Sequence, residues 1–242
     1  MAKRKRKRKT KKKLTPQEIL ISILFLLIFS YISYYKNDFL NLFIPSYAID
    51  AVPSYNGKSY VIINNNIPNF TEEEKQLSTF ESYSELDLLG RCGTAMANIS
   101  IDLMPTIPRD SIGVIKPSGW QTIKYDFVDG KYLYNRCHLI GYQLTGENAN
   151  EKNLITCTRS MNTIGMLEFE NKVAKYIKDT QNHVLYRVTP IFEGSNLLAS
   201  GVEMEAYSIE DKGRGISFHV YVYNVENGVE INYRDGTSTL AQ

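Results

Sequence analysis

Two segments decide the fold, YNRCHLIGY at residues 134–142 and NTIGMLEFENKVAKYIK at residues 162–178. The second segment has the period of an amphipathic helix, because at about 100° per residue its apolar side chains gather on one side. These side chains are Met166, Phe169, Val173 and Ile177. Two polar residues, Asn162 and Glu170, fall inside the same apolar arc, about 40° to either side of its centre if the helix is uninterrupted. Each therefore needs a polar partner or a function.

The residues before these segments predict short elements. Tyr60–Ile63 has a strand pattern, and Thr71 with Glu74 predicts a capping box that opens a short helix through Leu77. Residues 125–134 predict a strand, a tight Asp-Gly turn and a second strand that leads into the 134–142 segment.

The C-terminal third is rich in Val, Tyr and Phe, which predicts four strands, at 184–192, 202–209, 217–225 and 229–233. Asn227-Gly228 predicts a hairpin between the last two strands. We therefore expect an α+β domain with a largely antiparallel central sheet flanked by helices.

The N-terminus has the composition of a membrane anchor. Ten basic residues lie between Lys3 and Lys13, and the uncharged segment Ile19–Tyr35 follows them. A basic tail before an apolar segment favours a cytoplasmic N-terminus and an exported C-terminal part. We expect a tail at 1–18, a transmembrane signal anchor at 19–35, a juxtamembrane linker at 36–54 and a folded domain at 55–242. A signal peptide cleaved after Ser46-Tyr47-Ala48 is the alternative.

The charge distribution limits how the domain contacts nucleic acid. Removing the ten basic residues of the tail leaves 18 basic against 26 acidic residues, a net charge of −8. A broad electrostatic surface for nucleic acid requires a basic domain. Any contact with nucleic acid must therefore be a local basic strip.

Three cysteines, Cys92, Cys137 and Cys157, lie in the exported part. An odd number allows at most one disulfide and leaves one free thiol. Three buried thiols are an equally good interpretation.

The functional groups concentrate within 36 residues. They include the guanidinium of Arg136, the imidazole of His138, two carboxamides and the carboxylate of Glu170. Asn-Arg-Cys-His138, followed by Asn153 and by Asn162 on a helix, resembles the hallmark of the DNA/RNA non-specific endonuclease family, the ββα-metal nucleases, which is Asp-Arg-Gly-His and then an Asn-bearing helix. Further likeness to the streptococcal branch lies in NNNIPNFTEEE, KPSGW, YLY and YRVT, so that the resemblance covers roughly residues 59–237.

The resemblance implies a role for each of these residues. His138 would be the general base that activates water, and Asn162 would be the direct protein ligand of one Mg²⁺, for which Mn²⁺ can substitute. Glu170 would hold a water on the metal, or be an ion-paired core residue. Arg136 would contact phosphate or pin its loop, and Asn153 would orient the site through hydrogen bonds.

The sequence departs from the family hallmark at two positions. Asn135 stands where Asp is usual, and Cys137 stands where Gly is usual. Both the implied base and the implied ligand are retained, so these changes bear on efficiency more than on activity. Cys137 could form a disulfide with Cys92.

Basic loop residues are the candidates for holding the substrate. They are Arg91, Arg109, Lys116 and Lys124, each of which is individually more typical of solvated surface charge. His183 and His219 lie in strand patterns and are expected to be sheet residues. Trp120 follows Pro-Ser-Gly and is expected to pack in a turn.

The expected function is that of a membrane-anchored, extracytoplasmic endonuclease that hydrolyses DNA, with RNA as a further substrate, by a one-Mg²⁺, histidine general-base mechanism. Two alternatives are a catalytically impaired, membrane-tethered nucleic-acid-binding protein and a secreted DNase released by signal cleavage. The sequence leaves the DNA-to-RNA preference, the biological role and the oligomeric state open.

Overall fold

The computed structural model describes residues 15–34, 46–47, 49–76 and 78–241. The chain divides into two compact units, Met1–Ile44 and Pro45–Gln242. In the first unit, α1 spans Pro16–Tyr34. Within the described residues, no helix reaches the combination of length and apolar character required for a membrane span. The basic run, Tyr35, Ala48 of the alternative cleavage site and most of the expected linker lie outside the described residues.

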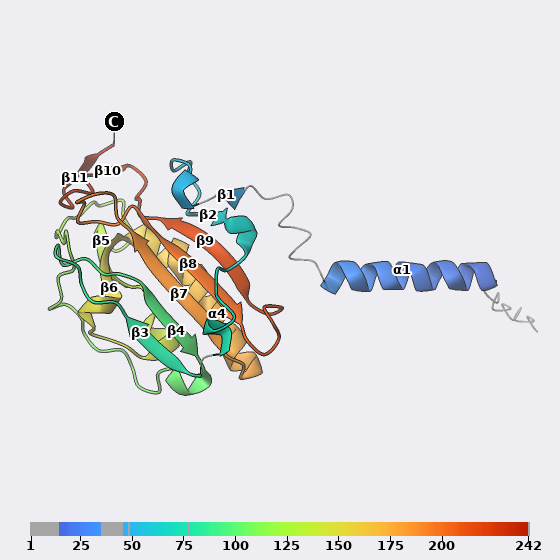
Figure 1. The fold of residues 1–242 in the computed structure, drawn as a ribbon. Coiled ribbons are helices and arrows are strands. Elements are labelled where there is room, and N and C mark those ends of the chain that lie inside the picture. Colours follow the sequence, from blue (N-terminus) through green and yellow to red (C-terminus); the bar gives the residue numbers. More distant parts are fainter. Residues whose placement is uncertain (1–14, 35–45, 48, 77, 242) are drawn as a thin grey trace, which may run out of the picture. The chain divides into compact units, whose positions relative to one another are not determined.

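The second unit is built on a seven-stranded sheet with the order β1-β2-β9-β8-β7-β4-β3 (Figure 1). All neighbours are antiparallel except β1 and β2. The strands are β1 (Ser46–Tyr47), β2 (Tyr60–Ile63), β3 (Phe80–Tyr83), β4 (Ala95–Ile99), β7 (Val184–Ile191), β8 (Gly201–Ser208) and β9 (Ser217–Tyr223). The expected α+β architecture with a largely antiparallel central sheet is confirmed, although few helices flank it.

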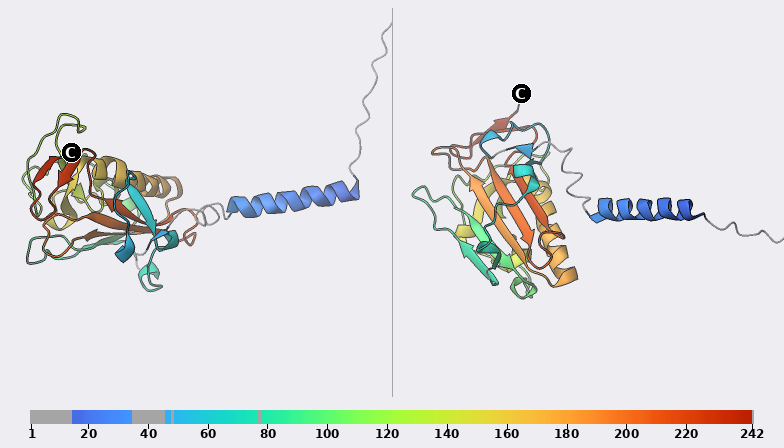
Figure 2. Two further views of the ribbon diagram at one scale, coloured as in Figure 1. Left: turned by 90° about the horizontal axis from the view of Figure 1, so that it is seen from above. Right: turned by 45° about the vertical axis from the view of Figure 1, so that its right-hand side comes forward.

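Helix α4 (Leu167–Thr180) covers one face of this sheet (Figure 2). Alternate residues of the central strands, such as Tyr186, Val202 and Val220, form one core with Phe169 and Val173 of the helix. This core occupies the space between the helix and the sheet and fixes the position of α4.

A second, smaller sheet pairs β5 (Tyr134–His138) with β6 (Leu154–Thr158) in antiparallel register. The short helix α3 (Tyr142–Thr145) lies in the connection between them. A π-helical segment, Met161–Met166, follows β6 and continues directly into α4. The order β5, β6, α4 is therefore a ββα unit. A third sheet, β10 (Val229–Ile231) with β11 (Ser238–Leu240), lies near the C-terminus.

A disulfide joins the two strands of the ββα unit. It links Cys137 on β5 to Cys157 on β6, with a Cα–Cα distance of 5.9 Å. Each cysteine lies two residues from the partner of the other in the β5–β6 register, so both side chains point to the same face. The expected bridge between Cys92 and Cys137 is wrong. Cys92 is a buried free thiol whose Sγ lies 3.1 Å from the carbonyl oxygen of Leu154.

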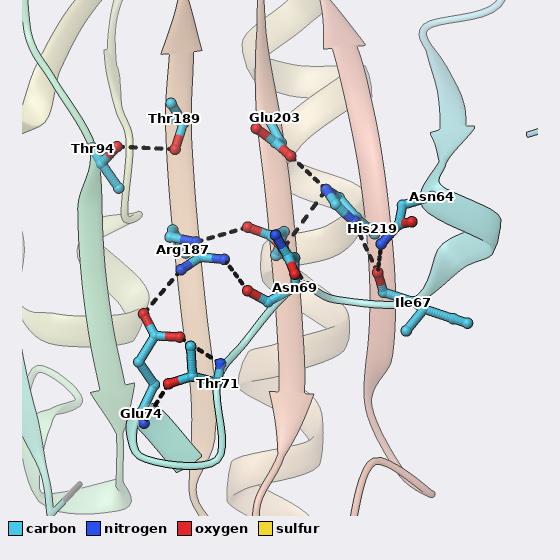
Figure 3. Close-up of polar contacts among 11 residues, drawn as sticks. Asn64, Ile67, Asn69, Thr71, Glu74, Thr94, Arg187, Thr189, Glu203 and His219 are labelled. Atoms are coloured by element: carbon cyan, nitrogen blue, oxygen red, sulfur yellow. Dashed lines mark hydrogen bonds and ion pairs between the residues drawn. The ribbon is translucent and has the colours of Figure 1, made fainter. Parts of the chain in front are cut away.

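The other face of the main sheet is covered by residues 64–76, which are held by a buried ionic network (Figure 3). His219 bonds Glu203 through Nε2 at 2.5 Å and the carbonyl oxygen of Ile67 through Nδ1 at 2.9 Å. Arg187 donates to Glu205 at 2.7 Å and to the carbonyl oxygen of Asn69 at 2.7 Å. The network therefore ties the loop to the strands β7, β8 and β9.

The capping box at Thr71 and Glu74 is present. The backbone N–H of Thr71 donates to Glu74 at 2.7 Å, and that of Glu74 donates to the Thr71 hydroxyl at 3.1 Å. The helix that follows is only a 3₁₀ turn, Glu74–Gln76, and its expected end at Leu77 lies outside the described residues. The Glu74 carboxylate also accepts a hydrogen bond from Arg187 of β7. This contact ties the turn to the sheet, and among the described residues no longer helix follows it.

Two expected hairpins are wrong. Residues 125–131 form turns with one isolated bridge, Lys124 to Tyr132, and the strand that follows pairs with β6 instead. The residues around Asn227-Gly228 do turn, but β9 is already bonded to β2 and β8 on its two edges. β10 therefore pairs with β11.

Candidate active site

Two adjoining cavities lie beside the ββα unit. The smaller, about 280 Å³, is lined by Arg109, Arg136, His138, Gly141, Tyr142, Gln143, Asn162, Thr163, Leu167 and Glu170. The larger, about 530 Å³, is lined by Arg109, Ile112, Trp120, Thr122, Tyr132, Tyr134, Asn135, Arg136, Arg159 and Asn162. Three residues belong to both linings, so the cavities form one continuous depression. These residues are Arg109, Arg136 and Asn162.

His138 is the last residue of β5 and is mostly buried, with 7% of its surface exposed. Its Nε2 lies 2.8 Å from the carbonyl oxygen of Asn148. A carbonyl oxygen can only accept, so Nε2 carries the proton and Nδ1 is left as the basic nitrogen. Burial, together with the positive charge of Arg109, lowers the pKa of His138 to about 4. The imidazole is therefore neutral and able to accept a proton above that pH.

Asn153 holds the backbone directly after His138. Its side chain is fully buried, accepts from the N–H of Ile140 at 2.9 Å and donates to the carbonyl oxygen of the same residue at 3.0 Å. Asn153 lines neither cavity, so it positions the loop that follows β5 and does not face a substrate.

Asn162 lies in the π-helical segment, where the N–H of Leu167 bonds its carbonyl oxygen. In an uninterrupted α-helix, Asn162 and Glu170 would lie about 80° apart. A π-turn advances each residue by roughly 80° instead of 100°, which over the four steps to Met166 removes most of that angle. Asn162 and Glu170 consequently point from nearly the same line of the helix into the smaller cavity.

Glu170 is buried on α4, and burial raises the pKa of its carboxyl group to about 7. A hydrogen bond with Gln143 and the charge of Arg109 lower this pKa only in part. Gly141 makes room for the carboxylate, because a Cβ atom at Gly141 would lie 2.5 Å from Oε2 of Glu170. Within the part of the chain that the structure describes, this carboxylate forms no ion pair, and a buried negative charge of that kind favours the approach of a cation.

Arg136 is held by the loop before β5. Its Nε donates to the carbonyl oxygen of Ile115, its Nη2 donates to that of Gly113 at 2.8 Å, and its guanidinium lies 3.9 Å from the centre of the Trp120 ring. The side chain thus pins the loop while it lines both cavities. Trp120 packs against it, in the turn where packing was expected.

The remaining basic candidates separate into two groups. Arg109 is exposed and lines both cavities. Arg91 lines neither, because it bonds Asp87 at 2.7 Å and the carbonyl oxygens of Gly194 and Asn196. Lys116 is exposed outside both linings, and Lys124 lies over the Tyr132 ring at 4.5 Å.

Several lining residues could not be singled out from the sequence. Gly141 is part of the 134–142 segment, but its contact with Glu170 depends on the position of α4. Tyr132 and Tyr134 belong to the YLY motif and Arg159 follows β6, but no spacing signal marked any of the three as a cavity residue. Their convergence follows from the pairing of β5 with β6, which brings residues 20 or more positions apart into one wall.

A second group of side chains could hold a metal ion, namely Glu203, Glu205 and His219. It lies on the sheet face opposite α4, where side chains alternate with the core residues of β8 and β9. Burial alone would lower the pKa of His219, but its bond with Glu203 and the charge of Glu205 outweigh burial and raise that pKa. His219 and Arg187 already bond these carboxylates, His219 to Glu203 at 2.5 Å and Arg187 to Glu205 at 2.7 Å. His219 is a sheet residue, as expected, and His183 bonds Glu210 near the start of β7.

Comparison with known proteins identifies relatives of this arrangement. A family model described as DNA/RNA non-specific endonuclease matches residues 68–210. A deoxyribonuclease from Streptococcus dysgalactiae subsp. equisimilis is 34% identical over 110 residues, which cover 43% of this chain and 32% of that relative. The match therefore spans about a third of the length of that relative.

Two solved structures have a similar fold. NucA from Streptococcus agalactiae, crystallised with a magnesium ion bound, has a TM-score of 0.69 and 24% identity, and the match covers 86% of this chain and 95% of NucA. The Sda1 nuclease with a bound zinc ion has a TM-score of 0.56 and 28% identity, over 67% of this chain and 81% of Sda1. The likeness to NucA demonstrates the fold.

Proposed function

Because the chain belongs to the DNA/RNA non-specific endonuclease family, we propose that it is a metal-dependent endonuclease that hydrolyses phosphodiester bonds of DNA, with RNA as a further substrate. One observation carries the proposal. His138 and Asn162, which are 24 residues apart in the sequence, line the same cavity together with Glu170. A base, a neutral oxygen ligand and a carboxylate in one depression are the groups that such hydrolysis requires.

His138 is the general base in this proposal. With the proton of Nε2 held by the carbonyl oxygen of Asn148, Nδ1 accepts a proton from the attacking water. The lowered pKa keeps the ring neutral and ready to accept that proton at neutral pH. Asn153 fixes the backbone behind the ring, so that the direction of Nδ1 is maintained through the reaction.

Asn162 and Glu170 fit a hard divalent cation such as Mg²⁺, with Mn²⁺ as a substitute. The carboxamide oxygen of Asn162 is a ligand type that Mg²⁺ accepts, and the Glu170 carboxylate supplies negative charge in a buried position. When bound, the ion would stabilise the charge that develops on the phosphoryl and leaving oxygens. The zinc ion in Sda1, which is 28% identical, supports a divalent metal in this fold.

Arg109 and Arg136 bring positive charge to the same depression. Arg136 is fixed by two backbone carbonyl groups, so it meets a phosphate with little loss of side-chain freedom. Arg109 is exposed at the edge of both cavities and is free to approach the substrate. The two arginines form the local basic strip that an otherwise acidic domain needs.

The test is cleavage of plasmid DNA and of RNA by the full chain, with Mg²⁺ and with EDTA. We expect cleavage with Mg²⁺ only. His138→Ala should lose about 10²–10⁴-fold in turnover while it still binds DNA. Asn162→Ala should also lose activity, and excess Mg²⁺ should restore part of it, because that change weakens a ligand and leaves the base in place.

Two results would contradict the proposal. Binding of DNA without cleavage by the unaltered chain would identify an impaired nucleic-acid-binding protein. Equal activity of His138→Ala and the unaltered chain would remove the base from the mechanism.

We also propose that the uncharged segment Ile19–Tyr35 anchors the domain to a membrane, with the nuclease outside the cell and the N-terminus in the cytoplasm, although α1 itself falls short of the length and apolar character of a membrane span. The support is the basic run before this segment, which favours a cytoplasmic N-terminus. Protease added to intact protoplasts should remove the domain and spare an N-terminal tag. Protection of the domain would refute export, and a mature N-terminus near Ile49 would indicate cleavage and a secreted DNase.

A further inference from the structure

The larger cavity has an unusual lining for this domain. Three arginines and three aromatic residues contribute to it, and no Asp or Glu does among the described residues. These six residues are Arg109, Arg136, Arg159, Trp120, Tyr132 and Tyr134. The chain beyond the basic tail carries a net charge of −8, so a depression without carboxylates is a place where an anion meets little repulsion.

Arg159 is presented to this cavity in a fixed orientation. It follows β6 directly, and its Nε and Nη2 both donate to Oδ2 of Asp129, at 3.0 and 2.8 Å. Asp129 itself is exposed and lies outside the lining. The guanidinium is thus oriented by a partner on its outer side, while it remains part of the cavity wall.

The aromatic side chains provide surfaces for a base. Tyr134 is buried and bonded through its hydroxyl to the carbonyl oxygen of Gly236 at 3.0 Å, so its ring is fixed. Tyr132 is 46% exposed. The guanidinium of Arg136 lies 3.9 Å from the centre of the Trp120 ring, so the two side chains form a cation–π pair in the cavity wall.

Asn135 gives the cavity a feature specific to this chain. Its Nδ2 is buried and has no hydrogen-bond partner among the described residues, and the residue belongs to the lining. The family hallmark has Asp at this position. A carboxylate there would place a negative charge in the wall, whereas the carboxamide leaves the wall neutral or positive and adds a donor.

From these observations we propose that the larger cavity is a nucleotide subsite, which binds the nucleotide adjacent to the scissile phosphate. This inference rests on the proposed function. At about 530 Å³ the cavity has the size of a small-molecule site and accommodates one nucleotide. Arg159 contacts the phosphate next to the one cleaved, Tyr132 meets the base, and Asn135 donates to an oxygen of the same nucleotide. The shared residues Arg109 and Arg136 join this subsite to the catalytic cavity.

Two substrates distinguish an effect on nucleotide binding in the subsite from an effect on the hydrolysis step. A DNA oligonucleotide fills both cavities, whereas bis(4-nitrophenyl) phosphate offers a single phosphodiester and no nucleotide. Arg159→Gln and Tyr132→Ala should each raise the KM for the oligonucleotide by about tenfold, the effect of losing one charge-assisted or one stacking contact. For bis(4-nitrophenyl) phosphate, kcat/KM should remain within about twofold. Arg214→Gln is the matched control, because Arg214 is also held by an aspartate, through the carbonyl oxygen of Asp211, and lines neither cavity.

Binding provides an independent measurement. The anisotropy of a fluorescent oligonucleotide, titrated with the full chain in EDTA at several salt concentrations, should show weaker binding for Arg159→Gln and a salt slope reduced by about one. Unchanged binding and KM in Arg159→Gln and Tyr132→Ala would overturn the subsite, as would an equal loss with both substrates. If the unaltered chain cleaves neither substrate, the proposed function fails, and the binding titration still decides whether the cavity receives a nucleotide.

Discussion

Replacement of Glu170 by Gln separates the energetic cost of the buried carboxylate from its use in catalysis. Burial raises the pKa of Glu170 from 4.5 to about 7. Below pH 4.5 the carboxyl group is neutral in both the folded and the unfolded chain. Between pH 4.5 and 7 the unfolded chain loses this proton first, so folded-state stability falls as the pH rises. Above pH 7 the group is ionised in both states and the loss is complete.

The magnitude follows from this shift. One pKa unit corresponds to 1.36 kcal/mol, so ionised Glu170 destabilises the metal-free folded state by up to about 3 kcal/mol above pH 7. Glutamine has nearly the same shape and does not ionise, although its amide still requires partners in a buried position. We therefore expect Glu170→Gln to be more stable at pH 8 by about 1–3 kcal/mol. At roughly 2–4 °C per kcal/mol for a chain of this size, Tm should rise by several degrees.

The assay is calorimetry of the full chain in EDTA at several pH values from 4.5 to 8. The difference in Tm between Glu170→Gln and the unaltered chain should grow with pH and be small at pH 4.5. Glu168→Gln is the control, because Glu168 lies on the same helix but is exposed and pairs with Lys172. The variant should also cleave DNA about 10–100-fold more slowly. A Tm difference that does not change with pH would refute the reasoning about burial, and undiminished cleavage would refute a role for the carboxylate.

Three further predictions concern the scaffold. Asn153→Ala removes two buried backbone hydrogen bonds and should lower the free energy of unfolding by about 2–4 kcal/mol in urea denaturation, with a loss of activity; a change below about 0.5 kcal/mol would contradict the positioning role. Reduction of the Cys137–Cys157 disulfide should lower the free energy of unfolding by about 2–4 kcal/mol. The Cys92→Ala variant should still gain the mass of two hydrogen atoms on reduction, because Cys92 is not part of the disulfide. A disulfide-linked peptide that contains Cys92 would contradict this assignment. Tyr186→Phe removes a buried hydroxyl that has no hydrogen-bond partner among the described residues, so it should stabilise the fold by about 1 kcal/mol, and a destabilisation of that size would imply a partner.

The sequence predicts the elements whose signal is local. Helical periodicity locates α4 and places Glu170 on its buried side, and the C-terminal strands fall within a few residues of their expected bounds. The hairpin at Asn227-Gly228 fails because turn residues predict where the chain turns but not which strand edges are already occupied, and both edges of β9 are occupied, by β2 and β8. At residues 125–134 the chain also turns, but the paired region is reduced to the single bridge between Lys124 and Tyr132.

The candidate site also combines residues that the sequence indicates with an arrangement that depends on distant parts of the chain. The resemblance names His138, Asn162 and Glu170, and their convergence in one cavity depends on the π-helical segment, which no periodicity calculation includes. Arg159 and Gly141 become visible only when β5, β6 and α4 are packed together. The disulfide partner of Cys137 likewise follows from strand register and could not be obtained from the number of cysteines.

The π-helical segment has a consequence for how variants of this chain tolerate insertions and deletions. A π-turn is equivalent to an α-helix with one additional residue. Deleting one residue between Met161 and Met166 would let the helix become regular while every cavity-lining side chain of α4 remained in the sequence. If Asn162 itself is kept, Asn162 and Glu170 would then lie seven residues apart, which at about 100° per residue separates their directions by only about 20°. Such a deletion mutant should fold with its two metal-facing side chains still on one line of the helix, so the segment should tolerate the loss of one residue without losing the geometry of the site.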